Sequence, residues 1–246
     1  MLRQAKIQAR ILWNRRFKLR HRKRGYRLLS GSGLEIGAFY LPAKVPKKTS
    51  IIYADALTRE EAFARFPELQ GYPLVQVDHQ VDLDQEGLIG IADGQFDFLI
   101  INHVLEHVAN PIFVIEEMLR VVKSGGHLVI TIPDKDFSVD RSRQLTSFEH
   151  LLEEYRVGTK EVSDEHYLDF IRGVHPELLQ LSPIELQTRV QEIRRRREHA
   201  HVWDSRTFKR FFVKACDEVL KIPATLEFES VGQKNRNEYF SVWNKR

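Results

Sequence analysis

FDFLIINHVLEHVANPIFVIEEMLRVVKSGGHLVITIPD spans residues 96–134, and this stretch decides the fold. Phe96 to Ile101 is a short, mostly apolar run, which predicts a strand buried on both faces. His127 to Pro133 predicts a second buried strand. A strand, a helix and a strand at this spacing form a right-handed crossover between two parallel strands. The stretch therefore predicts an α/β fold with a parallel sheet.

The segment between these two strands carries the signals of a helix. Asn110-Pro111 supplies an N-cap and a first-turn proline. Apolar residues then recur at helical spacing, and this core-facing stripe comprises Ile115, Met118, Leu119 and Val122. We expect the helix to end at Gly125-Gly126, because glycine readily adopts the left-handed conformation found at helix termini.

The same stretch resembles a known family. Phe-Asp-Phe-Leu-Ile-Ile-Asn, His-Val-Leu-Glu-His and Leu-Arg-Val-Val-Lys-Ser-Gly-Gly-His-Leu-Val-Ile are similar to the fourth strand, fourth helix and fifth strand of class I S-adenosylmethionine-dependent methyltransferases. Upstream, Leu34-Glu35-Ile36-Gly37 resembles their cofactor loop. From about residue 33 onward, the chain resembles a bacterial subgroup of methyltransferases that is often grouped with surface-glycan genes. The resemblance implies a Rossmann-like class I methyltransferase fold with S-adenosylmethionine as the cofactor.

The cofactor loop departs from the pattern of that family. The resemblance places Gly37 where the backbone approaches the methionine part of the cofactor, since a Cβ would clash there, and it places Glu35 near the methionine ammonium. Only 12 residues separate Gly37 from Ser50, and two of them are prolines. We therefore expect an irregular loop in place of the usual first crossover helix.

Four further polar residues follow predicted strands. Asp55 ends the second strand, where an acid can accept both ribose hydroxyls. The resemblance places Asp82, after a third strand at Pro73 to Val77, near the adenine amino group. Asn102 and His103 end the fourth strand and are expected to face the cofactor, because ligands lie beyond the carboxyl ends of parallel strands.

His103, Glu106 and His107 also spell H-x-x-E-H, a spacing that would bind zinc if it lay on one helix face. The motif follows a buried strand directly and stops at Asn110-Pro111, whereas a zinc-binding helix would continue. A metal at this motif is therefore possible but is not predicted.

The composition narrows the class of protein. The 246 residues, 42% of them hydrophobic, are enough for one large domain or one domain with an insertion. No apolar run is long enough to span a membrane, and the N-terminus is too basic for a secretory signal. The single cysteine, Cys216, excludes an internal disulfide and is expected to be a buried side chain in a cytoplasmic protein.

Basic residues concentrate at the N-terminus. Residues 1–28 hold 11 of the 38 Lys and Arg and none of the 34 acids, so the rest of the chain is acidic. The pattern is loosely that of an amphipathic helix. Such an arm could pack across the acidic body, lie on an anionic membrane surface as part of a peripheral protein, or contact nucleic acid, for which the aromatic residues are few.

We divide the chain into a basic arm (1–29), a cofactor-binding core (30–134), a helical insertion (135–203) and a C-terminal helix and hairpin (204–246). The hairpin strands, Thr225 to Gly232 and Glu238 to Trp243, look like the sixth and seventh strands of the family. They would complete a seven-stranded, mostly parallel sheet of order 3-2-1-4-5-7-6. The insertion should form a lid or substrate platform, with helices over Thr146–Tyr155, Glu165–Val174 and Pro183–Arg197.

The insertion also carries half of the ten histidines, namely His150, His166, His175, His199 and His201. A hydroxyl acceptor would benefit from a general base with a pKa near neutrality. The candidates are His201, His199, His150 and Asp134, in that order. We expect methyl transfer to an oxygen or nitrogen of a small molecule, with a sugar or lipid-linked glycan as the suggested acceptor. The alternative is a degenerate methyltransferase fold that acts as a binding or scaffold module.

Overall fold

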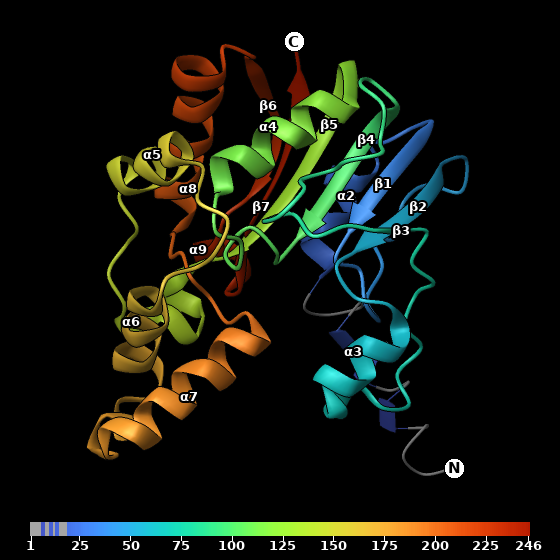
Figure 1. Ribbon diagram of the computed structural model, residues 1–246. Coiled ribbons are helices and arrows are strands. Elements are labelled where there is room, and N and C mark those ends of the chain that lie inside the picture. Colours follow the sequence, from blue (N-terminus) through green and yellow to red (C-terminus); the bar gives the residue numbers. More distant parts are fainter. Residues whose placement is uncertain (1–5, 8–9, 12, 15–18) are drawn as a thin grey trace.

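The computed structural model describes residues 6–7, 10–11, 13–14 and 19–246. Much of the expected basic helix over residues 1–29 therefore lies outside the described residues. Figure 1 shows one twisted sheet with helices on its faces and further helices beyond the carboxyl ends of its central strands. Among the described helices, none combines the length and the apolarity that a bilayer crossing requires.

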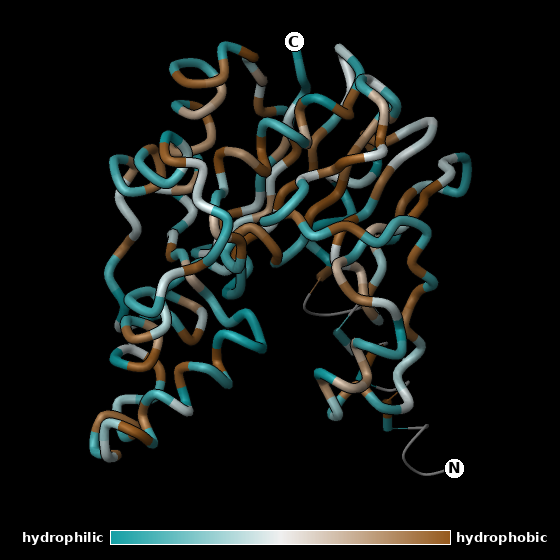
Figure 2. Tube along the Cα trace, viewed as in Figure 1, coloured by the Kyte–Doolittle hydropathy of each residue, from teal (hydrophilic) through white to brown (hydrophobic). Residues whose placement is uncertain are grey.

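The sheet has seven strands in the order β3-β2-β1-β4-β5-β7-β6, as predicted. The strands are β1 (Ser32–Ile36), β2 (Ser50–Asp55), β3 (His79–Gln80), β4 (Phe96–Asn102), β5 (Val122–Pro133), β6 (Ala224–Ser230) and β7 (Glu238–Lys245). Strands β1 to β5 pair in parallel, and β7 pairs antiparallel with both β5 and β6. The central strands are mainly hydrophobic along their length (Figure 2), because helices or loops cover both of their faces. The fold is thus the expected Rossmann-like class I methyltransferase fold.

Two helices pack on one face of the sheet (Figure 1). They are α4 (Pro111–Val121) and α8 (Ser205–Lys214), the second continued by a π-helical segment, η7 (Ala215–Leu220). Three residues of the predicted stripe, Ile115, Met118 and Leu119, lie on α4 and are fully buried, whereas the fourth, Val122, belongs to β5. The Asn110 side chain caps the helix by accepting from the Phe113 N–H at 3.0 Å. Cys216 is buried in η7, as expected.

The opposite face of the sheet is covered by the end of the basic arm. The short helices η2 (Arg20–Arg22) and α2 (Lys23–Tyr26) lie there, and Tyr26 and Leu29 join a buried cluster with strand residues such as Phe240. The contact is close, since a Cβ on Gly25 would meet the Phe240 ring at 2.4 Å. This part of the arm therefore packs across the body of the protein, one of the three arrangements the sequence left open.

The insertion forms three helices, each within two residues of its predicted ends. They are α5 (Phe148–Val157), α6 (Asp164–Val174) and α7 (Pro183–Arg196). Helix α6 packs on α7 through a second small core that includes Tyr167, Ile171 and Val190. Short 3-10 segments complete the chain: η3 (Pro67–Leu69) after α3 (Arg59–Arg65), η4 (Lys135–Phe137), η5 (Val139–Ser142) and η6 (Pro176–Gln180), with α9 (Gly232–Asn235) between β6 and β7.

Two local predictions were wrong. Pro73 to Val77 is not a strand: the Val75 N–H donates to the Phe39 carbonyl, and the third strand is only His79–Gln80 at the sheet edge. Helix α4 ends at Val121 and not at the glycine pair, because Val122 is already extended and begins β5. Gly125, with φ +77°, lies inside that strand.

Candidate functional site

Two adjoining hollows lie where β1, β2 and β4 end. Their volumes are about 270 and 280 Å³, and both are lined by Gly37, Phe39 and His103. Asp55 and Val104 line the first hollow, and Glu35 and Asn102 line the second. Each hollow alone is slightly smaller than a typical small-ligand pocket. A nucleoside with an amino-acid tail would therefore extend from one hollow into the other, with Gly37 at the junction.

The backbone at Gly37 suits close approach by a ligand. Its φ of +71° is in the left-handed region, and a Cβ there would lie 2.5 Å from Cγ2 of Val104. Only glycine meets both constraints without strain or displacement of a neighbour. The junction of the two hollows is thus a cradle that a side chain would fill, which fits the role expected for Gly37.

Glu35 fixes the loop that follows. Its side chain is 1% exposed, and both carboxylate oxygens lie 3.0 Å from the Ala43 N–H. Residues 37–49 contain no helix, as the short, proline-containing sequence predicted. Glu35 therefore lines the second hollow and also anchors the loop that replaces the first crossover helix.

Asp55 ends β2 and lines the first hollow. Burial raises the pKa of its carboxyl group to about 6, although its Oδ1 accepts from the Leu57 N–H at 3.1 Å. Desolvation of the ionised form outweighs the backbone hydrogen bonds here. The carboxylate is therefore poised to gain stability from ligand hydroxyls that donate to it.

Asp82 lies behind the cavity wall. Its neighbours Val81 and Leu83 line the first hollow, whereas its own Oδ2 pairs with Nη2 of Arg197. Its Oδ1 accepts from the Asp84 N–H at 3.1 Å. This arrangement holds Arg197, itself a lining residue, against the end of the first hollow.

Asn102 and His103 border the second hollow. Asn102 Oδ1 accepts from the Thr131 hydroxyl at 2.6 Å, and its amide donates to the Tyr26 hydroxyl at 3.4 Å. His103 has a left-handed backbone (φ +55°), and its Nε2 lies 2.8 Å from Oε2 of Glu238. Burial opposes protonation of His103, but hydrogen bonds with Glu106 and Glu238 raise its pKa to about 9. The imidazole is therefore positively charged at neutral pH.

Comparison with known proteins identifies the family. A family model described as a methyltransferase domain matches residues 30–215, which is most of the chain. The chain belongs to the methyltransferase domain family. This confirms the expected class of enzyme, a methyltransferase with S-adenosylmethionine as its cofactor.

Several solved structures resemble the methyltransferase at low identity. A Rhodobacter sphaeroides protein assigned to the Zn-dependent alcohol dehydrogenases is 14% identical with a TM-score of 0.51, covering 88% of this chain and 84% of that one. A methyltransferase of Thermotoga maritima, described as a possible histamine N-methyltransferase, is 15% identical with a TM-score of 0.49, covering 98% and 97%. A SAM-dependent methyltransferase of Aquifex aeolicus is 15% identical with a TM-score of 0.47 and the same coverage.

One curated relative matches over a short stretch. An uncharacterised protein of Methanocaldococcus jannaschii is 52% identical over 44 residues, which are 18% of this chain and 22% of that protein. A match of this length says nothing about the activity of the whole chain.

The H-x-x-E-H residues of the methyltransferase do not lie on a helix. Residues 104–109 form turns, so helical spacing does not apply to His103, Glu106 and His107. Glu106 is 1% exposed, and its Oε1 lies 3.4 Å from Nδ1 of His103 and 3.8 Å from Nε2 of His107. The turn thus places a buried carboxylate between two imidazoles that line the first hollow.

The four candidates for a general base do not line the cavity, although the ring centroid of His199 lies 4.7 Å from that of His107, which does. None of His201, His199, His150 and Asp134 lines either hollow. Asp134 is fully buried and accepts from the N–H and the hydroxyl of Ser205, which fixes the start of α8. His199 pairs with Asp140 at 2.6 Å. His150 and His201 meet in a separate cluster described below. A catalytic role for these four residues stays a prediction.

Two residues that shape the site, Glu238 and Arg22, were not predicted from the sequence. Glu238 is fully buried at the start of β7, and Arg22 of the arm binds it through Nε at 2.5 Å and Nη2 at 2.6 Å. His21 Nε2 is 2.7 Å from the same carboxylate. The only available signal was the unusually basic run in residues 1–28, which did not reveal a partner 216 residues away.

We expect Asp55→Ala to weaken binding of S-adenosylhomocysteine by roughly 1–3 kcal/mol, since hydrogen bonds to a charged group are lost. In the wild type, affinity should fall as the pH drops from 7 to 5, because the pKa near 6 means that Asp55 becomes protonated and accepts poorly. Isothermal titration calorimetry at several pH values measures both effects. Asp55→Asn is the matched variant, whose affinity should not change over this pH range. Wild-type affinity for Asp55→Ala would remove the residue from the site.

Proposed function

We propose that this methyltransferase transfers the methyl group to an oxygen of a small polar acceptor, with a sugar or lipid-linked glycan as the acceptor class. S-Adenosylmethionine, when bound, would supply a methyl group on a sulfonium, from which a neutral thioether departs as a good leaving group. The chain's own residues then have to bind, orient and deprotonate the acceptor. Gly37, Glu35, Asp55 and Asn102 are the residues that would hold the cofactor.

The observation that carries this proposal is the environment of His107. Its Nδ1 lies 2.6 Å from the carbonyl oxygen of Arg197, so a neutral imidazole donates there and leaves the lone pair on Nε2. Burial, partly opposed by the charge of Glu106, lowers the pKa of His107 below its usual value. His107 therefore stays neutral at physiological pH and can accept a proton.

Glu106 supports the same role. Its Oε1 lies 3.8 Å from Nε2 of His107, close enough to stabilise the imidazolium that forms when the acceptor hydroxyl gives up its proton. His103 is already protonated and cannot serve as the base. The pair of Glu106 and His107 favours hydroxyl acceptors, which need a base more than amines with a free lone pair do.

The walls of the cavity suit a polyhydroxylated ligand. Arg65, Arg197 and Glu198 line the first hollow, and Asn237 lines the second. Such groups donate and accept hydrogen bonds along a sugar. Arg196 closes the wall, since it pairs with Glu68 at 2.7 Å and lies over the Phe66 ring, joining α7 to the α3 side.

Transfer of a labelled methyl group from S-adenosylmethionine tests the acceptor class. We expect product with members of a panel of nucleotide sugars and lipid-linked oligosaccharides, and none with small amines or RNA. Labelling of amines or RNA alone would overturn the assignment. Calorimetry with S-adenosylhomocysteine distinguishes the enzyme from the alternative, a degenerate fold that acts as a binding or scaffold module. A module that does not bind the cofactor would show no binding heat.

We expect His107→Gln to lower kcat by roughly 10²- to 10⁴-fold, the usual contribution of a general base. The variant should bind S-adenosylhomocysteine as tightly as the wild type, because it changes the proton acceptor and not the cofactor contacts. Steady-state kinetics with the identified acceptor measures the change in kcat, and calorimetry measures the affinity for S-adenosylhomocysteine. An unchanged kcat at pH 7 would exclude His107 as the base.

A further inference from the structure

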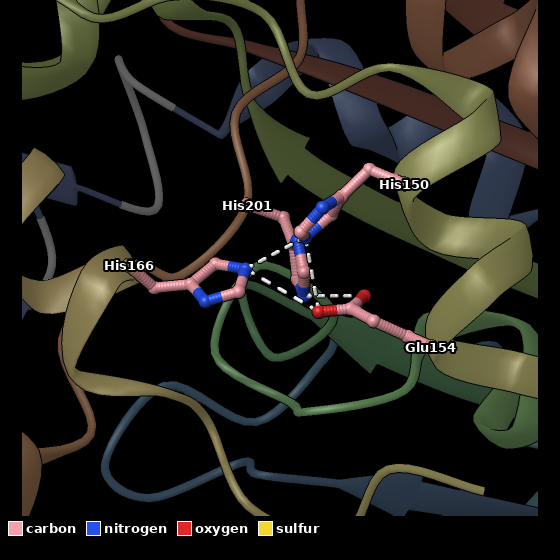
Figure 3. A group of neighbouring side chains, drawn as sticks. All are labelled: His150, Glu154, His166 and His201. Atoms are coloured by element: carbon pink, nitrogen blue, oxygen red, sulfur yellow. Dashed lines mark hydrogen bonds and ion pairs between the residues drawn. The ribbon is translucent and has the colours of Figure 1, made fainter. Parts of the chain in front are cut away.

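Four side chains from separate parts of the insertion meet outside the cofactor cavity. His150 and Glu154 come from successive turns of α5, His166 comes from α6, and His201 comes from the segment after α7. Figure 3 shows the three imidazoles and the carboxylate pointing toward one another. One potential ligand atom from each residue lies within 4.8 Å of those of the other three.

The distances match those of a metal coordination shell. Nε2 of His150 lies 2.9 Å from Nε2 of His166, and these atoms lie 3.1 and 3.3 Å from Oε1 of Glu154. In a tetrahedral zinc site, bonds of about 2.0–2.1 Å put neighbouring ligand atoms roughly 3.3 Å apart. The three atoms are therefore already spaced as ligands of one ion.

In two of the histidines, the nitrogen that does not face the cluster has a hydrogen-bond partner, and this partner sets the tautomer that metal binding needs. Nδ1 of His166 lies 2.8 Å from the Ser163 hydroxyl, and Nε2 of His201 lies 3.0 Å from the Val108 carbonyl oxygen. If His201 is neutral, its proton is on Nε2, where it donates to that carbonyl, and Nδ1 keeps a lone pair. Ligating histidines typically use their second nitrogen in this way.

Two buried atoms of the cluster have no hydrogen-bond partner in the described part of the chain, although one of them, Oε2 of Glu154, lies 3.7 Å from Nε2 of His201. Nδ1 of His201 and Oε2 of Glu154 are inaccessible and have no hydrogen-bond partner among the residues that the structure describes. His201 is 1% exposed and Glu154 8% exposed. Unsatisfied polar atoms of this kind are costly and usually mark a missing partner. A packing cluster of hydrogen-bonded histidines does not explain them, whereas a bound cation would.

We propose that His150, Glu154, His166 and His201 bind a divalent transition-metal ion, with zinc as the best match. Three imidazoles and one carboxylate are ligands that suit zinc and not calcium or magnesium. Four protein ligands leave no open position, which is typical of a structural site. His201 would bind through Nδ1. This inference is independent of the proposed acceptor and base.

The ion would connect the insertion to the cofactor cavity. It would tie α5 and α6 to the segment of His201, whose backbone N–H donates to the Glu106 carbonyl at 3.0 Å. The same segment follows directly from Arg197 and Glu198, which line the first hollow. The proposed role is therefore to hold this wall of the cavity in place.

Metal content of the full-length chain tests the proposal. The protein is purified without a metal-affinity tag, stripped with a chelator, and titrated with Zn²⁺ or Co²⁺. We expect about one equivalent of zinc by elemental analysis, the visible spectrum of tetrahedral Co²⁺, and a higher Tm with the metal bound. Absence of binding, or an octahedral Co²⁺ spectrum, would overturn the site.

Variants locate the ion. His150→Gln and His166→Gln should each lower zinc affinity at least roughly 100-fold, and Ser163→Ala roughly 10- to 100-fold, as for other outer contacts. His150 is half-exposed, so its replacement should not prevent folding, which circular dichroism checks. His175→Gln is the matched control, because His175 lies in the same insertion but pairs with Glu177. Wild-type zinc affinity in both ligand variants would place the ion elsewhere and refute the proposal.

Discussion

Glu238→Gln is expected to lower the free energy of unfolding by about 3–5 kcal/mol, because it leaves a buried cation without its counter-charge. Glu238 is fully buried, and the Arg22 guanidinium that it binds with two hydrogen bonds is 5% exposed. Burial disfavours the ionised carboxylate, but Arg22, His103 and His21 hold the pKa of Glu238 well below its usual range. Gln keeps the shape of the side chain and removes only the charge.

Equilibrium unfolding in urea, followed by circular dichroism, measures this change. Glu192→Gln is the control, since its pair with Arg189 is half-exposed and should contribute nothing measurable. The variant should also release the arm, so trypsin should cut after Arg20 to Arg27 faster than in the wild type. If the unfolding midpoint stays at the wild-type denaturant concentration, Arg22 must find another partner and the arm is not held by charge.

Gly37→Val is expected to lower affinity for S-adenosylhomocysteine at least roughly 100-fold, which corresponds to about 2.7 kcal/mol. A β-branched residue at φ +71° is strained, and its Cβ would lie 2.5 Å from Cγ2 of Val104. Val104 lines the first hollow, so any movement that relieves the clash also changes the cavity. Backbone strain at residue 37 and displacement of the Val104 side chain therefore both alter the first hollow.

The matched control for this variant is Gly90→Val. Gly90 has φ +80°, but its Cβ position faces open space and it lines neither hollow. Both variants should lose about 1–2 kcal/mol of stability from the left-handed backbone, while only Gly37→Val should lose cofactor affinity. Calorimetry and thermal unfolding of the two proteins separate these effects. Equal affinities in the two variants would show that Gly37 does not border the cofactor.

Much of the fold could be predicted from patterns formed by residues that are close in the sequence. The stripe of α4 and the buried runs of β4 and β5 follow periods of a few residues, so they can be read without a structure. The rule that ligands lie at the carboxyl ends of parallel strands placed Asp55 at the cavity, and the family resemblance placed Gly37 there. The prediction of the edge strand was wrong because β3 pairs through two residues only, and the apolar run before it hydrogen-bonds to the loop at Phe39 and not to β2.

The positions of the titratable side chains could not be predicted in the same way. Histidine is common both in packing and in catalysis, so His150 and His201 were expected near the acceptor and instead lie in the cluster with His166 and Glu154. His107 was considered as part of a zinc motif, and its place in a turn beside Glu106 gives it a different environment. Charge, burial and tautomer depend on neighbours that are distant in sequence.

The sequence by itself determined the central crossover, the helix on its core face and the edge where the cofactor is expected to bind, because these depend on local periodicity and on the geometry of parallel strands, while the sheet order followed from the resemblance to class I methyltransferases. Only the tertiary structure decided that Arg22 reaches Glu238 and that three histidines and Glu154 converge. Contacts between residues far apart in the chain have no local pattern, since each depends on how the whole chain packs.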